Sequence, residues 1–358
     1  MRIVRYYPRA LAGDGGMTGA VRAWSHALAG AGARAVVAFE EGVPPPANGN
    51  VQWVPVRHKR TNAVKIPVGL EEVLRGADLL VLHSGWTLHN VWAASVARRL
   101  RVPYLLEPRG AYDPHILRRK KLLKRLWWSA LESELVSQAR AIHVFFEVER
   151  GHLEALGYRG PLVVAPNGIE STEGLAWDGG TGGYLLWLGR FDPEHKGLDL
   201  LLRALRLLSD QERPSVRIHG PDWHGQKARV KRMVSRLDLG RWVTVGEPVY
   251  GSDKSSVLAG ARGFVYPSRW DACPNSVLEA VSAGVPTLAT SFPLGRYLAS
   301  RGAALLAEPD PGDLAGWLRH LCTPEASDVG RRGSQVVAEE LTWDRVARQW
   351  LDQVETIL

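Results

Sequence analysis

Short β-branched or apolar runs alternate with longer amphipathic stretches along the whole chain, and this alternation restricts the fold more than any other feature. In the first half the strand-like runs are RIVRYY, RAVVAF, VQWVPV, ADLLVLH, VPYLLE, RAIHVF and PLVVA. In the second half they are YLLWLG, SVRIHG, WVTVG, GFVYP and PTLAT. Strands and helices in regular alternation predict an α/β protein with parallel sheets covered by helices on both faces.

The length of the chain indicates two such domains. A chain of 358 residues exceeds the usual size of one hydrophobic core. Between the two halves lies PNGIESTEGLAWDGGTGG, where glycine and polar residues with weak periodicity are typical of a linker. We predict a first domain over residues 1–168, a linker over 169–182, a second domain over 183–338 and a terminal helix over 339–358.

Composition favours a folded protein of a reducing compartment. Apolar residues make up 45% and charged residues 23%, which is ordinary for a soluble domain. No run is long enough for a signal peptide or a membrane span, so we expect a cytoplasmic protein. The two cysteines, Cys273 and Cys322, have no metal-type spacing, and we expect neither a disulfide nor a cysteine–metal site.

The positive charge is concentrated in the first half. Residues 1–170 hold 23 Lys and Arg against 14 Asp and Glu, whereas the remainder holds 22 against 23. Much of the excess lies in HILRRKKLLKRLWW, residues 115–128. This segment fits contact with nucleic acid, an anionic membrane surface or an anionic substrate. It also fits a solvated helix whose apolar stripe packs in the core, and the sequence leaves these alternatives open.

Loops at the carboxyl ends of strands are where ligands of parallel α/β sheets bind. The loop after the first predicted strand contains Gly15 and Gly16 just before a helix, where backbone can approach an anion. The loop after YLLWLG carries Arg190 and Lys196, each beside a glycine. Two cations six residues apart at such a junction suit a diphosphate, although solvated surface cations would give the same spacing.

A third loop, in YPSRWDACPNSVLEAVSAGVP, holds two acids that a folding argument does not explain. Asp271 lies just before a predicted helix and Glu279 lies about one and a half turns into it, with Pro274 suited to the first helical position. Carboxylates accept hydrogen bonds from vicinal hydroxyls, and a helix N-terminus favours negative charge. The three loops together predict a nucleotide sugar as ligand.

The motifs GRFDPEHKGLDLLLRAL and YPSRWDACPNSVLEAVSAGVPTLAT closely resemble those of the retaining glycosyltransferases of family 4. The resemblance continues in GGMTGAVRAWSHALAGAGARAVV, PYLLEPRGAYDPH, ARAIHVF, VVAPNGIE and LTWDRVARQWL, so it spans nearly the whole chain. It implies the GT-B fold, in which two Rossmann-like domains face each other across a cleft. It also implies that the C-terminal helix returns to the first domain.

The resemblance assigns roles to the residues of the second domain. Arg190 and Lys196 would neutralise the donor diphosphate, Asp271 would hold hydroxyls of the donor sugar, and these three would form the catalytic set. Glu279 would accept hydrogen bonds from the ribose. The donor-binding set implied by the resemblance is completed by Gly15, Gly16, Ala272, Cys273, Pro274, Asn275 and Ser276.

The chain departs from the family pattern in two places. The first acid of the Glu-x7-Glu motif is Asp271, whose reach is shorter by one methylene. Many relatives carry a histidine after the strand that corresponds to VPYLLE, where this chain has EPRGAYDPH. Arg109 and His115, together with Trp86, are therefore the candidate sugar or acceptor contacts, and Arg109 serving only to turn the loop is the alternative.

The predicted function is a retaining transfer of a hexose-type sugar from a nucleotide diphosphate sugar to a saccharide, lipid-linked or small-molecule acceptor. The chain contains no Asp-x-Asp, so we expect no metal and no other cofactor. A nucleotide-sugar epimerase of the same fold is the alternative enzyme, and a basic nucleic-acid-binding protein is the alternative outside enzymes. The expected partners are the nucleotide sugar donor, the acceptor and the anionic inner face of the membrane. The sequence does not predict the base or the sugar of the donor, nor the identity of the acceptor.

Overall fold

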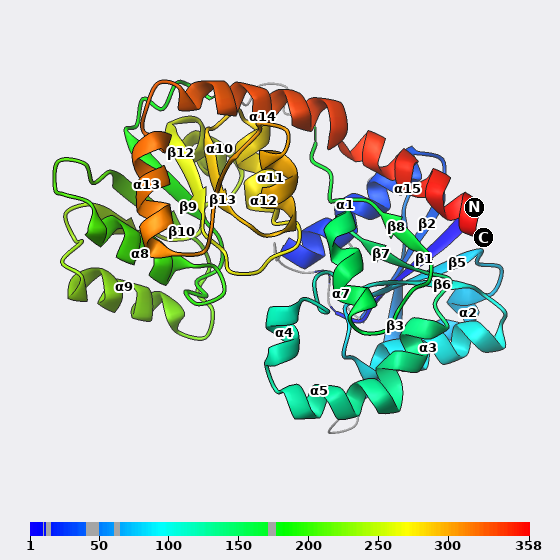
Figure 1. Cartoon of the computed structure of the whole chain (residues 1–358). Helices are drawn as coiled ribbons and strands as arrows, with labels where there is room; N and C mark the ends of the chain where they lie inside the picture. Colours follow the sequence, from blue (N-terminus) through cyan, green and yellow to red (C-terminus); the bar gives the residue numbers. More distant parts are fainter. Residues whose placement is uncertain (10, 12–15, 41–49, 61–64, 171–176) are drawn as a thin grey trace. The chain divides into compact units, whose positions relative to one another are not determined.

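The computed structural model describes the chain except residues 10, 12–15, 41–49, 61–64 and 171–176. Contacts between residues divide the chain, drawn in Figure 1, into two compact units. Unit 1 holds Met1–Gly168 and Trp343–Leu358, and unit 2 holds Ile169–Thr342. Among the described residues, no helix has the length and apolar character needed to cross a bilayer.

The sheet of unit 1 has eight strands in the order β4-β3-β2-β1-β5-β6-β7-β8. Neighbouring strands are parallel except β3 and β4. The runs predicted as strands are confirmed, whereas the antiparallel edge strand β4, which contains Pro67, was not predicted. The strands are β1 (Arg2–Tyr7), β2 (Arg34–Glu40), β3 (Gln52–Arg60), β4 (Lys65–Val68), β5 (Leu79–His83), β6 (Tyr104–Glu107), β7 (Ala141–Val144) and β8 (Leu162–Val164).

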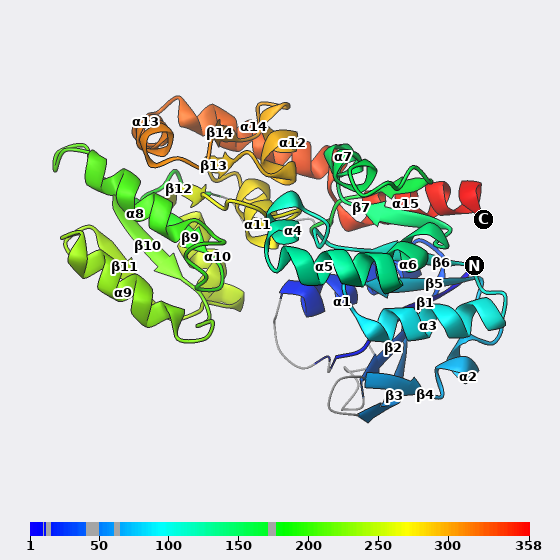
Figure 2. The same ribbon diagram turned by 60° about the horizontal axis from the view of Figure 1, so that its bottom comes forward.

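Helices pack on both faces of this sheet (Figure 2), and the C-terminal helix is one of them. Trp24 of α1 and Trp350 of α15 are fully buried, with ring centroids 6.2 Å apart, over the face that carries Ile3 and Val81. The C-terminal helix thus completes a core that begins at the third residue. The helices are α1 (Gly16–Gly30), α2 (Leu70–Leu74), α3 (Leu88–Arg99), α4 (Pro114–Arg118), α5 (Lys121–Trp127), η1 (Trp128–Glu132), α6 (Ser133–Ser137), η2 (Glu147–Glu149), α7 (Arg150–Glu154) and α15 (Trp343–Ile357).

Unit 2 has a six-stranded, fully parallel sheet in the order β11-β10-β9-β12-β13-β14. Its strands are β9 (Tyr184–Leu188), β10 (Ser215–His219), β11 (Val243–Val245), β12 (Ala261–Tyr266), β13 (Thr287–Thr290) and β14 (Leu305–Ala307). Helix α8 packs against α13, and α11 packs against α14. The helices are α8 (Leu198–Leu207), α9 (Gln226–Arg236), α10 (Gly251–Ala259), α11 (Asn275–Ser282), α12 (Pro293–Ala299), α13 (Pro311–Leu321) and α14 (Ala326–Glu340). Two parallel-sheet α/β units confirm the predicted fold class.

The strand order creates one topological switch point in each sheet. In unit 2 the chain continues from β9 to β10 on one side, while β12 lies on the other side of β9. In unit 1 the same reversal occurs between β1 and β5. Loops at a switch point leave the sheet in opposite directions, and ligands bind there. The loops after β9 and β12 are those that carry Arg190, Lys196 and Asp271.

Candidate active site

The loops after β9 and β12 contact each other so closely that only glycine fits at position 197. Gly197 has a φ of 68°, and a Cβ at this residue would lie 1.7 Å from the carbonyl oxygen of Pro267. The Ser268 hydroxyl donates to the His195 carbonyl at 2.9 Å. Arg269 donates to both carboxylate oxygens of Asp199 at 2.7 Å. The two loops therefore form one structural element at the switch point of unit 2.

This element brings Lys196 and Asp271 together across 75 residues of sequence, and their side chains form an ion pair through Oδ2 of Asp271. The Tyr266 hydroxyl donates to the same oxygen at 2.9 Å, and Lys196 Nζ lies 5.5 Å from the centre of the Tyr266 ring. Lys196 is 9% exposed, and 18% of the Asp271 side chain remains accessible. The sequence indicated both charged residues, but not that they contact each other or Tyr266.

The electrostatics of this centre keep Asp271 ionised. Burial alone raises the pKa of Asp271, but the charges of Lys196 and His195 and the hydrogen bonds from Lys196 and Tyr266 together hold that pKa below its ordinary value. Burial and the neighbouring Asp271 raise the pKa of Tyr266 well above its ordinary value, so its hydroxyl remains a donor. The centre thus offers a carboxylate acceptor and an ammonium donor side by side at neutral pH.

Arg190 lies in the same loop as Lys196 but has different neighbours. Its Nη2 atom is 3.0 Å from His195 Nδ1 and 3.5 Å from Asp192 Oδ2. Its guanidinium carbon lies 4.7 Å from the centre of the Trp223 ring, a cation–π distance. The side chain is 38% exposed. Arg190 therefore rests on an aromatic platform with much of its charge accessible.

Helix α11 starts one residue later than predicted. Pro274 occupies the N-cap, with φ −71° and ψ 122°, and Asn275 is the first helical residue. The Pro274 carbonyl accepts from the Val277 amide at 3.1 Å, and its extended ψ makes proline the cap rather than the first helical residue. The preceding residues, Ala272 and Cys273, are buried. The positive end of the α11 dipole therefore directly follows the loop that holds Asp271.

Glu279 has a partner of its own. Its Oε1 atom lies 2.8 Å from Nζ of Lys254 on α10, and about a third of each side chain is accessible. The two acids of the motif therefore have different lysine partners: Asp271 pairs with Lys196 and Glu279 with Lys254. Lys254 was not predicted from the sequence, because no local signal relates α10 to α11.

The candidate contacts of unit 1 lie at the carboxyl edge of its sheet. Trp86 and Arg109 occupy adjoining loops, since the Ser84 amide donates to the Glu107 carbonyl at 2.9 Å. The Trp86 indole donates to the Ala111 carbonyl at 2.8 Å. His115, on the short helix α4, is exposed and lies 3.1 Å from Asp113. Gly16 is the first residue of α1, and Gly15 lies outside the described residues.

A buried polar layer beneath Arg109 was not predicted from the sequence. On the α1 and α15 side of the sheet, apolar residues such as Ile3, Val81, Leu105 and Ala141 are followed two residues later by polar ones. Alternating polar positions within the strand-like runs were the available signal. The polar layer consists of Arg5, His83, Glu107 and His143, each at most 2% exposed.

The basic segment differs from the solvated helix with a core-facing apolar stripe that was one alternative from the sequence. Lys120 adopts a left-handed conformation, with φ 52°, and separates α4 from α5, so the segment is not one helix. No residue of either helix is buried. The three leucines of α5 do not pack in a core: Leu122, Leu123 and Leu126 are 78%, 59% and 67% exposed.

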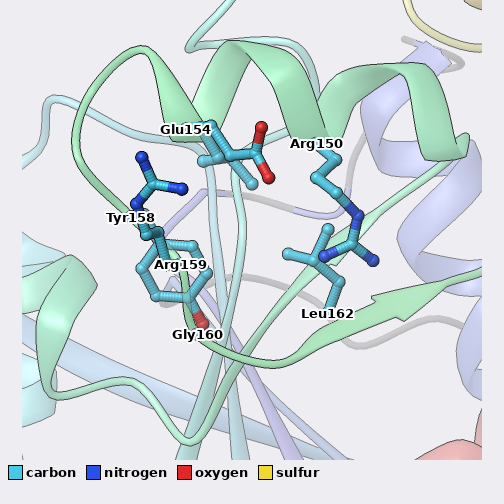
Figure 3. A pocket seen from close by; sticks show the side chains of 7 residues that line it. Arg150, Glu154, Tyr158, Arg159, Gly160 and Leu162 are labelled. Carbon is cyan, nitrogen blue, oxygen red and sulfur yellow. The ribbon is translucent and has the colours of Figure 1, made fainter.

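Two cavities in the described part of the chain lie away from these residues. The one shown in Figure 3, beside α7, has a volume of about 70 Å³ and is lined by Arg150, Glu154 and Tyr158 among others. A second lies between the end of α1 and strand β2. Neither contains a predicted site residue. The first is also much smaller than ligand sites, which are typically about 300–1,000 Å³.

The sequence matches two families of one enzyme class. Residues 15–168 match the glycosyl transferase 4-like domain, and residues 182–323 match the glycosyl transferases group 1. An O-antigen chain mannosyltransferase B from Escherichia coli is 28% identical over 182 residues. That match covers 50% of this chain and 46% of the relative, so the chain corresponds to about half the length of the curated protein.

Solved structures of this class share the fold along the whole chain. A sucrose-phosphate synthase from Thermosynechococcus elongatus has a TM-score of 0.77 at 18% identity, covering 100% of this chain and 99% of its own. The Anabaena protein HepE, solved with UDP and glucose, has a TM-score of 0.76 at 13% identity, covering 99% of each chain. With both halves matched in sequence and both units matched in fold, the chain belongs to the group 1 glycosyltransferases of family 4, with the GT-B fold.

Proposed function

We propose that the protein transfers a hexose from a nucleotide diphosphate sugar to an acceptor hydroxyl, with retention of anomeric configuration and without a metal ion. The observation that carries this proposal is the Lys196–Asp271 pair, fixed by Gly197 at the switch point of unit 2 and followed by the N-terminus of α11. A cation, a carboxylate and a helix N-terminus in one element suit the junction between a diphosphate and a sugar.

Each group of this element has a separate task in the proposal. When the donor binds, Lys196 exchanges part of its contact with Asp271 for phosphate oxygens, and Asp271 accepts hydrogen bonds from sugar hydroxyls. Arg190, on its Trp223 platform, supplies the second cation. Glu279 accepts from ribose hydroxyls and shares its charge with Lys254. Negative charge grows on the diphosphate as the glycosidic bond breaks, so cations already in place lower the barrier.

The comparisons support the classes of donor and acceptor. HepE is solved with UDP and glucose, and the mannosyltransferase from E. coli is named for an O-antigen chain. We therefore propose a nucleotide hexose as donor on unit 2 and a saccharide or a lipid-linked sugar as acceptor, bound mainly by unit 1. Trp86, Arg109 and His115 remain the candidate acceptor contacts.

Helix α5 supports contact with an anionic membrane surface as part of this function. Leu122, Leu123 and Leu126 are mostly exposed, and Lys121 and Arg125 on the same helix are exposed as well. Exposed leucines beside cations are typical of helices that lie in the headgroup layer. Each basic residue near an anionic surface contributes about 1 kcal/mol to binding. A membrane-borne acceptor would be presented at such a surface.

Product analysis tests the proposed reaction. The protein is incubated with UDP-, GDP-, ADP- and TDP-hexoses and a panel of saccharides, and NMR of the first-formed glycoside reports its anomeric configuration. We expect the donor configuration in the product and a rate unchanged by EDTA. An inverted product or a rate abolished by EDTA would contradict the mechanism. Epimerised donor without a glycoside would favour the epimerase instead.

A further inference from the structure

We infer that Arg109 is an anion-binding residue of unit 1 that takes a phosphate group of a substrate, and that Glu107 is its positioning residue. The inference deepens the proposed function, on which it rests, because it assigns a chemical group to the carboxyl edge of unit 1. It is carried by the contacts of the polar layer beneath the Arg109 loop.

Glu107, at the end of β6, is the centre of that layer. Its Oε2 atom lies 2.8 Å from Nη2 of Arg5 and 3.0 Å from Nδ1 of His83. His143 Nδ1 is 3.8 Å from the same oxygen. The other oxygen, Oε1, lies 2.6 Å from Nη2 of Arg109. One carboxylate thus faces two guanidinium groups and two imidazoles within the core.

The layer carries more positive than negative charge. Burial lowers the pKa of Arg5 to about 10, so Arg5 stays charged at neutral pH. Burial lowers the pKa values of His83 and His143 to about 4, so both are neutral. Burial alone would raise the pKa of Glu107, but the charges around it, that of Arg109 first, hold it well below its ordinary value. Two arginines against one carboxylate leave an excess positive charge, which is costly in a buried site without an anion.

Of the residues around Glu107, Arg109 lies in the loop that follows β6, at the carboxyl edge of the sheet. Its side chain is 8% exposed, and its guanidinium carbon lies 5.7 Å from the centre of the Phe145 ring. Within the described part of the chain, its Nε and Nη2 atoms are buried without a hydrogen-bond partner, so the approach of Nη2 to Glu107 is an ion pair that lacks hydrogen-bond geometry. A buried guanidinium N–H without an acceptor is unfavourable, and a phosphate oxygen would satisfy it.

The backbone around Arg109 is held in sparsely populated conformations. Arg109 has a φ of 51°, and Ser84 and Trp86 on the adjoining loop have φ values of 69° and 62°. Residues other than glycine adopt positive φ values at a cost in free energy, and such residues cluster at functional sites. Three of them on two loops at the switch-point edge of unit 1 are the second observation that favours a ligand here.

The test separates this site from the donor site of unit 2. Full-length protein carrying Arg190→Ala and Lys196→Ala is titrated with inorganic phosphate and pyrophosphate by calorimetry. We expect one remaining anion site, weakened at least tenfold by the further change Arg109→Gln and only partly by Arg109→Lys. A background protein that binds no phosphate, or an Arg109→Gln change without effect, would overturn the inference.

Glu107→Gln gives a test in which the direction of the change in phosphate affinity decides between two roles of Glu107. Removal of a negative charge alone would tighten phosphate binding, whereas loss of the positioning contact to Arg109 weakens it. We expect weaker binding, with the fold checked by circular dichroism, and tighter binding would show that Glu107 only balances charge. Arg213→Gln is the matched control for Arg109→Gln, because the Arg213 side chain is also buried but donates from Nε and Nη2 to the carbonyls of Leu205 and Leu208.

Two further titrations with nucleoside diphosphates show whether the phosphate belongs to the donor or to the acceptor. They also separate failure of the proposed donor site from failure of the Arg109 site. In protein with an intact donor site, Arg109→Gln should leave affinity for nucleoside diphosphates unchanged if the phosphate belongs to the acceptor. Weakened nucleotide binding would assign it to the donor. If Arg190→Ala and Lys196→Ala leave nucleotide binding intact, the proposed donor site fails while the Arg109 effect still stands on its own.

Discussion

Replacement of Lys196 with alanine removes the ammonium group that pairs with Asp271 and, in the proposed reaction, with the donor diphosphate. A charge-assisted hydrogen bond contributes about 1.5–3 kcal/mol, which corresponds to about a 10- to 150-fold change. Because this contact strengthens as the diphosphate departs, we expect kcat/KM to fall by at least that factor. The assay follows release of nucleoside diphosphate from the nucleotide sugar that gives turnover.

The same substitution leaves Asp271 without its cation, and the structure sets how much stability is lost. Asp271 keeps hydrogen bonds from the Tyr266 hydroxyl and from the Ala272 amide at 3.1 Å, and 18% of its side chain is accessible. We therefore expect a loss of about 1–2 kcal/mol in the free energy of unfolding, below the cost of a fully buried orphan charge. Adding Asp271→Asn should restore part of the stability but none of the activity.

Lys227 provides the matched control for Lys196. It also pairs with an acid, Glu247, and its Nζ atom lies 5.7 Å from the centre of the Phe191 ring. The two lysine side chains are 13% and 11% exposed. Lys227→Ala should leave kcat/KM within about threefold of wild type. The reasoning is refuted if Lys196→Ala keeps full activity, or if both lysine variants lose activity alike.

Three further outcomes are expected. Gly197→Ala should lower the free energy of unfolding by at least about 1–3 kcal/mol in urea titrations, because it adds strain at a positive φ and a clash with the Pro267 carbonyl. Burial raises the pKa of Glu149 to about 7, from an ordinary value of 4.5, so wild type should lose stability as pH rises from 4.5 to 7 and Glu149→Gln should not. Changing the three exposed leucines of α5 to asparagine, or Arg118, Arg119, Lys120 and Lys121 to glutamate, should release the protein from anionic liposomes at low salt.

Each of these outcomes has a control. Gly225 also has a positive φ, of 75°, but a Cβ there meets nothing within 4 Å, so Gly225→Ala should cost less than Gly197→Ala. Parallel pH profiles for wild type and Glu149→Gln would contradict the Glu149 prediction. For the liposome test, α9 carries five basic residues against three on α5, but its valines Val230 and Val234 are buried. Charge reversal on α9 should therefore leave binding largely intact, and wild type that stays in the supernatant would contradict membrane contact.

Much of the fold followed from local patterns. Apolar runs such as YLLWL and FVY are buried in parallel strands regardless of their partners, and Gly197 and Pro274 mark the starts of α8 and α11 to within a residue. The edge strand β4 was not predicted because its four residues include Pro67 and its pairing is antiparallel. Local sequence also gave no sign that Lys120 is left-handed and interrupts the helix.

The candidate site was predictable as a set of residues but not as a set of contacts. Lys196 and Asp271 are recognisable one by one, yet their pairing depends on how closely Gly197 approaches Pro267. The Glu107 layer was missed because each strand contributes a single polar residue, and only the assembled sheet places these residues together. The sequence patterns therefore did not predict which charged residues pair when they are far apart in the chain.

The central claim is that the element around Lys196 and Asp271 binds a nucleotide diphosphate sugar. Calorimetric titration of wild type and of the Arg190→Ala, Lys196→Ala double variant with UDP, GDP, ADP and TDP tests it most directly. We predict that at least one of the four nucleotides binds wild type with one site per chain, and that the double variant binds it at least about 100-fold more weakly. Equal affinity in the two proteins, or no binding of any of the four to wild type, would contradict the account.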